Sequence, residues 1–168
     1  MALLLAGAVH AAAAAAPADE LSINLQQQPW TGDLGAMIAR RYIRVLVPYS
    51  RTLYFVDLGG TQRGMSYDFM RAFEDDFNAR LGHGDLRVHV VFIPVSRAHL
   101  LPLLLAGEGD IAAANLTITP ERSRIVDFAA PAARDVKELI VTGPGAPALA
   151  TLDDLAGKEV YVSRATSY

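Results

Sequence analysis

The chain has no cysteine among its 168 residues. This absence excludes disulfide bonds, thiolate nucleophiles and zinc sites built on cysteine. Positive charge is not in surplus either, because 15 Lys and Arg residues stand against 18 Asp and Glu residues and the net charge is -3. Such a chain has no general electrostatic attraction for nucleic acid, so we do not expect nucleic acid as a partner.

Several catalytic signatures are also missing. The stretches "GEGD" and "GPG" are not followed by Lys and then Ser or Thr, so they do not form a nucleotide-binding loop. There is no Gly-x-Ser-x-Gly motif of a serine hydrolase. His83, His89 and His99 share no spacing typical of metal ligands. We therefore expect no metal, no other cofactor and no catalytic residue within this chain.

Residues 1–18, "MALLLAGAVHAAAAAAPA", are typical of a secretory signal peptide. An apolar run precedes small residues, and Val9-His10-Ala11 fits the small-x-small pattern of a cleavage site. No Lys or Arg precedes the run, so either the true start lies upstream or the segment is not a working signal. The alternative is a low-complexity, alanine-rich helix. A signal peptide would predict export to the periplasm.

Strand and helix patterns alternate in the rest of the chain. Residues 19–42 are interpreted as a polar linker with a short helix, Asp33–Arg41. β-branched runs predict strands, and apolar residues spaced three and four apart predict helices. The expected elements are strands at Ile43–Val47, Leu86–Ile93 and Asp110–Ala114, a short extended piece at Tyr54–Val56, and helices at Ser66–Leu81 and Ser96–Ala106. This order predicts an α/β fold with a mainly parallel sheet.

Two helices carry more specific expectations. Phe69, Ala72, Phe73, Phe77 and Leu81 form the apolar stripe expected to be buried in the first. Pro102 conflicts with the second, so it either kinks that helix or the helix begins later than Ser96.

The last third of the chain is less regular. We expect a helical turn at Pro120–Ser123 and another at Asp153–Ala156, and a turn-rich break at Gly143–Leu149. Extended segments are predicted at Ile125–Phe128 and Lys137–Val141, and a strand is predicted at Glu159–Val162.

The stretch "NLTITPERSRIVDFAAP" follows the predicted strand at Asp110–Ala114. In open parallel sheets, ligands bind beyond the carboxyl ends of the strands. Asn115, Thr117, Thr119 and Arg122 all lie at such an end. A guanidinium matches a carboxylate in bidentate geometry, and Thr117 offers a hydroxyl and an N–H group. These residues together could form a carboxylate-binding site, although composition alone favours a solvated arginine.

Three motifs resemble one family. "GDIAAANLTITPERSRIVDFAAP", "RGMSYDFMRAF" and "IRVLVPYSRTLYF" are similar to the type II periplasmic solute-binding domain of family 3. The resemblance covers about residues 43–168. "PWTGDLGAMIARRYIRVLVPYSRTLYFVD" and "GKEVYVSRATSY" most resemble the solute-binding module that precedes the catalytic domain in lytic murein transglycosylase F-like proteins.

The resemblance implies a Venus flytrap fold with two lobes. Residues 43–140 would form the first lobe, and residues 141–168 the crossover and the truncated start of the second. The implied function is binding of a small carboxylate-bearing ligand, an amino acid or a cell-wall peptide fragment, to regulate a transglycosylase domain outside this chain. Peptidoglycan and the outer membrane would then be partners of missing parts. The alternatives are a component of an amino-acid transporter, the sensor domain of a kinase, and a prephenate-type dehydratase.

The family's ligand-binding residues map onto particular positions here. Arg122 and Thr117 match the residues that bind the ligand carboxylate, and Asn115 matches a position whose backbone carbonyl takes the ammonium. Thr166 and Ser167 match the second-lobe helix start that meets the same carboxylate. Tyr54 and Phe55 match the pocket wall. Met65 stands where many amino-acid binders carry an aromatic residue, which departs from the pattern of a free amino-acid site.

Overall fold

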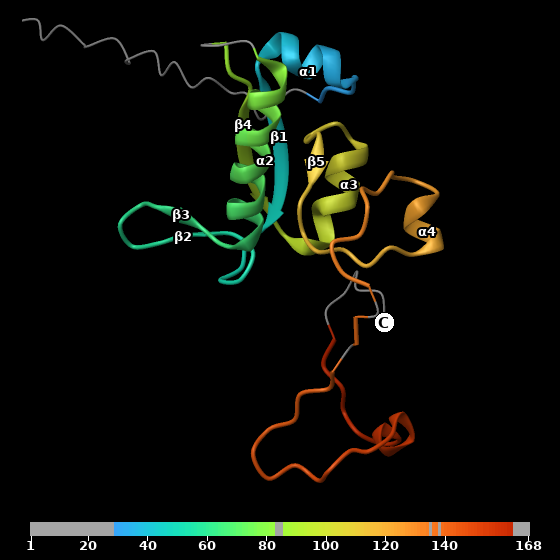
Figure 1. The fold of residues 1–168 in the computed structure, drawn as a ribbon. Helices are drawn as coiled ribbons and strands as arrows, with labels where there is room; N and C mark the ends of the chain where they lie inside the picture. The colour runs from blue at the N-terminus through green and yellow to red at the C-terminus, as the bar shows by residue number, and fades with distance from the viewer. Residues whose placement is uncertain (1–28, 83–85, 135, 138, 163–168) are drawn as a thin grey trace, which may run out of the picture.

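The computed structural model describes residues 29–82, 86–134, 136–137 and 139–162. Its main sheet has three parallel strands in the order β4-β1-β5, and a short antiparallel pair, β2-β3, projects beside it (Figure 1). The strands are β1 (Tyr42–Pro48), β2 (Phe55–Val56), β3 (Gln62–Arg63), β4 (His89–Val95) and β5 (Ile111–Ala112). The helices are α1 (Leu34–Arg40), α2 (Met65–Leu81), α3 (Leu100–Leu105) and α4 (Pro120–Ser123), with 3-10 turns η1 (Arg97–His99) and η2 (Leu152–Leu155). The predicted α/β class is confirmed.

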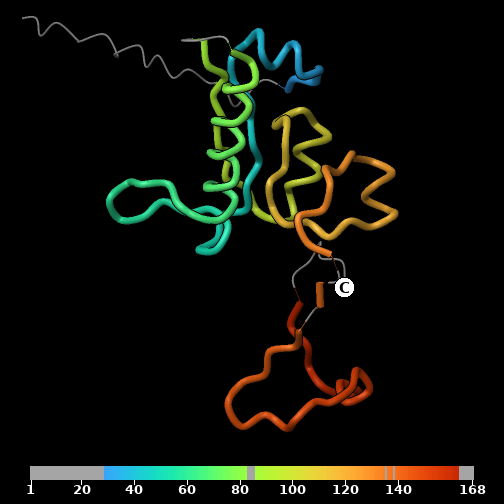
Figure 2. The backbone as a smooth tube through the Cα atoms, in the orientation of Figure 1, coloured from blue at the N-terminus to red at the C-terminus, as the bar shows by residue number. Residues whose placement is uncertain are grey.

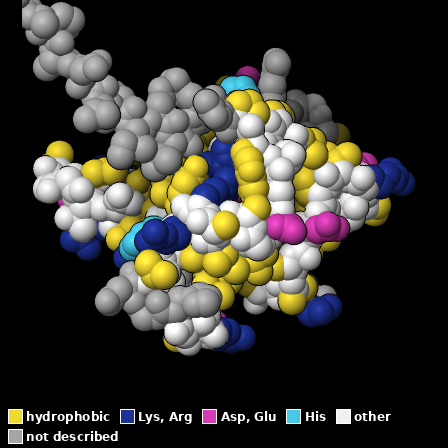
Figure 3. All heavy atoms as spheres, turned by 90° about the horizontal axis from the view of Figure 1, so that it is seen from above, with side chains coloured by type: hydrophobic (Ala, Val, Ile, Leu, Met, Phe, Trp, Pro, Cys, Tyr) yellow, Lys and Arg dark blue, Asp and Glu magenta, His cyan; other side chains and the backbone are white. Residues whose placement is uncertain are grey.

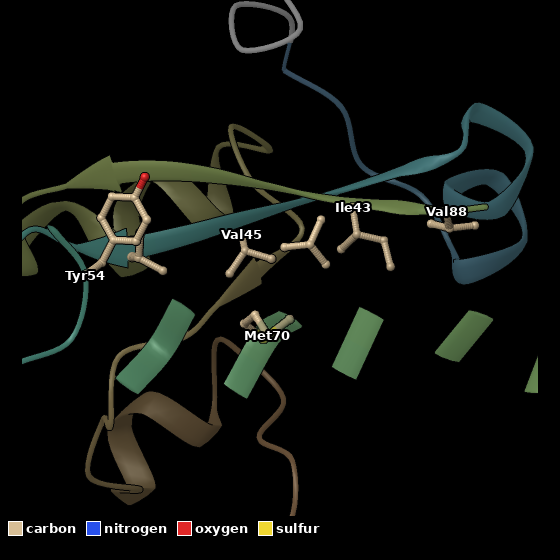
Figure 4. Packing of buried hydrophobic residues seen from close by; sticks show 7 residues of the cluster. Ile43, Val45, Tyr54, Met70 and Val88 are labelled. Atoms are coloured by element: carbon tan, nitrogen blue, oxygen red, sulfur yellow. The ribbon is translucent and has the colours of Figure 1, made fainter. Parts of the chain in front are cut away.

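Strand β1 is buried on both faces and lies at the centre of a three-layer lobe. Ile43, Val45 and Val47 point to one face, where Met70 of α2 packs against them (Figure 4). Leu46 points to the other face and packs against Leu100 of α3. This alternation follows from the two-residue period of a strand, and burial on both faces explains why the run is wholly apolar apart from Arg44.

Helix α2 begins and ends at glycines. Gly64 precedes it with a φ of 119°, and a Cβ at this position would lie 2.4 Å from the carbonyl oxygen of Leu53. Only glycine fits such a positive φ and so close an approach. The helix ends at Gly82, which adopts the left-handed conformation of a C-cap.

The predicted stripe of α2 is confirmed in part, because Phe73, Phe77 and Leu81 pack against the core whereas Ala72 is exposed. Ser66, Met70 and Glu74 are buried, whereas Phe69 is 67% exposed. Glu74 is buried because it accepts the N–H of Val90 at 2.8 Å and pairs with Arg71. Asn78, one turn later, exchanges two hydrogen bonds with the backbone of Val88. Helix α2 therefore covers part of the outer edge of β4, which protects an edge strand from pairing with other chains.

The predicted helix at Ser96–Ala106 is divided. The turn η1 comes first, and α3 follows from Leu100, so the later start suggested by Pro102 is the correct alternative. Pro102 lies in the first turn of α3, where its missing N–H leaves no helical hydrogen bond unmade. Ser96 does not cap the helix through its side chain; its hydroxyl instead contacts Nδ1 of His99 at 2.8 Å.

Residues 139–162 lie apart from the lobe (Figure 2). The predicted strand at Glu159–Val162 is wrong, and neither Ile125–Phe128 nor the described part of Lys137–Val141, both expected to be extended, forms a strand. The turn η2 agrees with the expected helical turn, and Thr151 and Asp154 form its capping box. None of these runs has a described strand beside it, so their backbone groups do not join the sheet.

An ion cluster ties the start of the described chain to the amino ends of the strands. Asp110 binds Arg44 at 2.9 Å and also Arg40, and both the Arg44 and Asp110 side chains are 1% exposed. The Arg40 guanidinium stacks on the Trp30 ring, with its Cζ 3.9 Å from the ring centroid. The backbone N–H of Trp30 donates to the carbonyl of Gly107. Figure 3 views the lobe from this end, where basic and acidic side chains lie scattered among hydrophobic ones.

Candidate functional site

The carboxyl ends of β1, β4 and β5 meet at one edge of the sheet, because the three strands are parallel. Figure 1 shows this edge at the arrowhead of β1, with α4 beyond the end of β5. The predicted site segment, residues 115–122, lies here, where open parallel sheets bind ligands.

Side-chain donors hold the backbone carbonyls that follow β5. The Ser66 hydroxyl donates to the carbonyl of Ala113 at 2.8 Å. Arg97, just after β4, donates to the carbonyl of Ala114 at 2.9 Å and to that of Asn115 at 3.4 Å. The guanidinium of Arg122 donates to the carbonyl of Thr117 at 2.9 Å. Four backbone acceptors after β5 are therefore bound by side chains of the lobe.

Helix α4 fixes the position of Arg122. The Thr119 hydroxyl accepts the N–H of Arg122 at 3.3 Å, and Pro120 occupies the first helical position. The pKa of Glu121 is lowered by its own backbone N–H and by the Thr119 hydroxyl, so its charge favours the helix start. One short turn of helix thus returns the Arg122 guanidinium to Thr117.

Asn115 and Thr117 present different groups. Asn115 has a φ of 47°, a left-handed conformation that asparagine tolerates better than most residues. Its carbonyl, the predicted ammonium acceptor, is bound by Arg97. The N–H and hydroxyl of Thr117 donate to no residue that the structure describes, and the residue is exposed. Thr117 and Arg122 are brought together as the sequence predicts.

Tyr54, Phe55 and Met65 lie in three different environments. Tyr54 is 4% exposed in the core and stacks on Phe92 with ring centroids 5.5 Å apart, so it packs rather than lining an open surface. Burial, followed by the neighbouring Tyr67, raises the pKa of the Tyr54 phenol. Phe55 is half-buried in the β2-β3 hairpin, and Met65 is 48% exposed at the first position of α2. Thr166 and Ser167 lie outside the described residues.

A separate hollow of about 390 Å³ lies beside the outer edge of β4, away from the strand ends. It is lined by Gln62, Tyr67, Arg71 and Val90–Phe92. None of the predicted site residues that the structure describes lines it. In the described part of the chain, no three His, Asp or Glu side chains gather as metal ligands would.

Arg97 and Ser66 were missed by the sequence interpretation. The sequence pattern predicts Arg97 to lie inside a helix that begins at Ser96. Arg97 nevertheless comes shortly after the predicted strand at Leu86–Ile93. Such a position, just beyond the carboxyl end of a parallel strand, is the signal that could have identified it. Ser66 was read as the helix start, with no indication that its hydroxyl would reach Ala113.

Comparison with known proteins identifies the family. Residues 43–156 match the family model of bacterial extracellular solute-binding proteins, family 3. The chain belongs to this family. The described lobe is accordingly one lobe of the type II periplasmic-binding fold, as the three motifs predicted. No described helix is long and apolar enough to cross a membrane.

The relatives reported next share about a third or less of their residues with this chain. The chain is 30% identical over 128 residues to membrane-bound lytic murein transglycosylase F of Aeromonas hydrophila subsp. hydrophila. The aligned residues are 76% of this chain and 24% of that protein. The family 3 chain thus spans about a quarter of this curated relative. An ancestral arginine-binding protein solved with arginine is 31% identical, with a TM-score of 0.45 over 55% of this chain and 37% of that one. Holo ArgBP from T. maritima is 26% identical, with a TM-score of 0.48 over 59% and 40%.

Proposed function

We propose that this chain recognises a small solute through a carboxylate, which binds between Arg122 and Thr117 at the carboxyl edge of the sheet. One observation carries the proposal: the guanidinium groups of Arg97 and Arg122 both bind the backbone of residues 114–117 at the carboxyl edge, so positive charge gathers beside Thr117. An anion is the natural partner of such a surface. Family membership supports a solute-binding role.

The ligand class is a carboxylate-bearing amino acid or cell-wall peptide fragment. Thr166 and Ser167 would approach the same carboxylate from a second lobe that begins near residue 141. In a longer protein like the transglycosylase relative, ligand binding in this periplasmic module would regulate cleavage of peptidoglycan by a separate domain. The similarity to that relative, over 76% of this chain, is the reason for proposing a transglycosylase as the regulated enzyme.

The first test is removal of the Arg122 guanidinium. Isothermal titration calorimetry would measure binding of free amino acids and cell-wall peptides to the longest gene product that contains these residues. Breaking a shielded ion pair costs about 3–5 kcal/mol, so Arg122→Ala should weaken affinity by roughly two to four decades. Arg122→Lys should recover only part of this loss, because the planar fork of the guanidinium is missing.

Arg124→Ala is the matched control. Arg124 is an exposed residue that ends α4, and its removal changes net charge by the same amount. Affinity should change by well under one decade, as expected of a solvated charge. Equal affinities of the Arg122→Ala and Arg124→Ala variants would show that Arg122 does not bind the ligand.

A second measurement addresses regulation. Release of soluble fragments from purified peptidoglycan by the same long product should change when a ligand identified by calorimetry is added. The Arg122→Ala variant should keep the ligand-independent rate and lose the response. A response that survives in Arg122→Ala would contradict regulation through this site.

A further inference from the structure

Arg97 spans the end of the sheet. It follows β4, which lies on one side of β1, and its guanidinium reaches the carbonyls of Ala114 and Asn115, which follow β5 on the other side. Its side chain therefore crosses the carboxyl edge of the central strand. Thr117, the proposed carboxylate-binding residue, is two positions beyond Asn115, a distance of about 7 Å at most along an extended chain.

The charge of Arg97 has no acidic partner among the described residues. Several other arginines of the lobe do have one: Arg44 pairs with Asp110, Arg71 with Glu74, and Arg87 with Asp75. Arg97 binds only backbone carbonyls, and it is half-buried rather than fully solvated. A guanidinium has five N–H groups, so others remain for a ligand after these two bonds. A half-buried cation without a carboxylate is well placed to receive an anion.

The same contacts disfavour a ligand ammonium. An ammonium group has three donors and needs acceptors. Arg97 already binds the carbonyls of Ala114 and Asn115, so an ammonium that used the second lone pair of either oxygen would lie beside a like charge. A second carboxylate would instead meet a donor of opposite charge.

We propose that Arg97 is a second anion-binding group, so that the site selects compounds with two carboxylates a few carbons apart and no free ammonium. N-acylated acidic amino acids, free or at the end of a peptide, are this chemical class. The inference rests on the proposed function, because Arg122 and Thr117 hold the first carboxylate. It adds that Arg97 determines specificity and that ordinary zwitterionic amino acids are the weaker ligands.

The test uses three matched probes: N-acetyl-L-glutamate, N-acetyl-L-glutamine and L-glutamate. Calorimetry on the longest gene product should show that N-acetyl-L-glutamate binds about tenfold or more tightly than each of the others, the size of one charged hydrogen bond. Arg97→Ala should bring the ratio between N-acetyl-L-glutamate and N-acetyl-L-glutamine to within about threefold, while Arg97→Lys should keep most of it. Arg87→Ala removes the same charge at the opposite end of β4 and should leave the ratio unchanged.

The outcomes separate this inference from the function beneath it. Tighter binding of L-glutamate than of its N-acetyl form would overturn the inference, even if Arg122→Ala abolishes binding and so supports the carboxylate site. Equal weakening of both N-acetyl probes by Arg97→Ala, in a variant whose circular dichroism and thermal unfolding match the parent, would show that Arg97 only holds the carbonyls. No loss on Arg122→Ala for any probe would refute the proposed function itself.

Discussion

The lobe and residues 139–162 contain similar apolar runs, but these runs are buried in the lobe and exposed in residues 139–162. In β1, Val45, Leu46 and Val47 are each 0% exposed, whereas Leu139 is 83% and Val141 is 92% exposed. Composition does not explain the contrast, since both runs are β-branched and aliphatic. The difference is in neighbours: β1 pairs with β4 on one side and β5 on the other and is covered by helices on both faces. An apolar run becomes a core strand only when partners supply its hydrogen bonds and cover.

The largest effect should come from the buried acid of the lobe. Asp110→Asn leaves Arg44 buried without its carboxylate, and breaking such a pair costs about 3–5 kcal/mol of unfolding free energy. Asp153→Asn, the same change in the exposed segment, should alter it by less than about 0.5 kcal/mol. Urea unfolding followed by circular dichroism measures both. Similar midpoints for the two variants would remove the distinction between the regions.

A smaller effect is expected from matched leucines. Leu46 of β1 is 0% exposed and packs against Leu100 of α3. Leu46→Ala should lower the free energy of unfolding by about 2–5 kcal/mol, because apolar burial is lost and a cavity forms. Leu152 is 77% exposed, so Leu152→Ala should be within about 0.5 kcal/mol of the parent. The same urea titration applies, and a large loss for Leu152→Ala would mean that the segment packs in solution.

The smallest effect concerns two exposed carboxylates, one in each region. A hydrogen bond from Arg63, then the N–H of Thr61, lowers the pKa of Asp57, whereas the N–H groups of Thr151 and Ala150 lower the pKa of Asp154. Because both folded-state pKa values are depressed, their contribution to stability is present above the ordinary carboxyl pKa. It is lost as pH falls through the folded-state value.

Arg63→Ala tests these causes separately. The pKa of Asp57, measured by NMR titration of its side-chain carbon, should rise toward the ordinary value, while that of Asp154 should not move. An unchanged pKa for Asp57 would show that Arg63 does not hold the carboxylate in solution.

Much of the lobe could be predicted from local pattern. The wholly apolar run of β1, the glycines around α2 and the proline at the start of α4 each act within a few residues, and the structure agrees with all three. Only part of the buried face of α2 could be predicted this way, because the stripe includes Phe73, Phe77 and Leu81 but not the buried Met70 and Glu74. Glu74 is buried because a backbone N–H of β4 faces it, and Phe69 is exposed because no described element covers it; both depend on residues distant in the sequence.

The candidate site was predictable to the same degree. Thr117 and Arg122 lie five residues apart and are joined by one turn of helix, so their proximity is a local matter. Arg97 reaches Ala114 across β1, a contact that depends on the order of strands in the sheet. The burial of Tyr54 depends likewise on Phe92 of β4. Thr166 and Ser167 lie outside the described residues and stay predictions.

The attachment of Trp30 has a spectroscopic consequence. It is the single tryptophan of the chain, and it lies against Arg40 and Gly107 at the amino ends of the strands, opposite the edge where Arg97 and Arg122 lie. Tryptophan fluorescence therefore reports whether the amino-terminal segment is packed against the amino ends of the strands. A ligand that binds at the carboxyl edge should leave this fluorescence unchanged. A change in that emission on ligand addition would mean that the two ends of the sheet communicate.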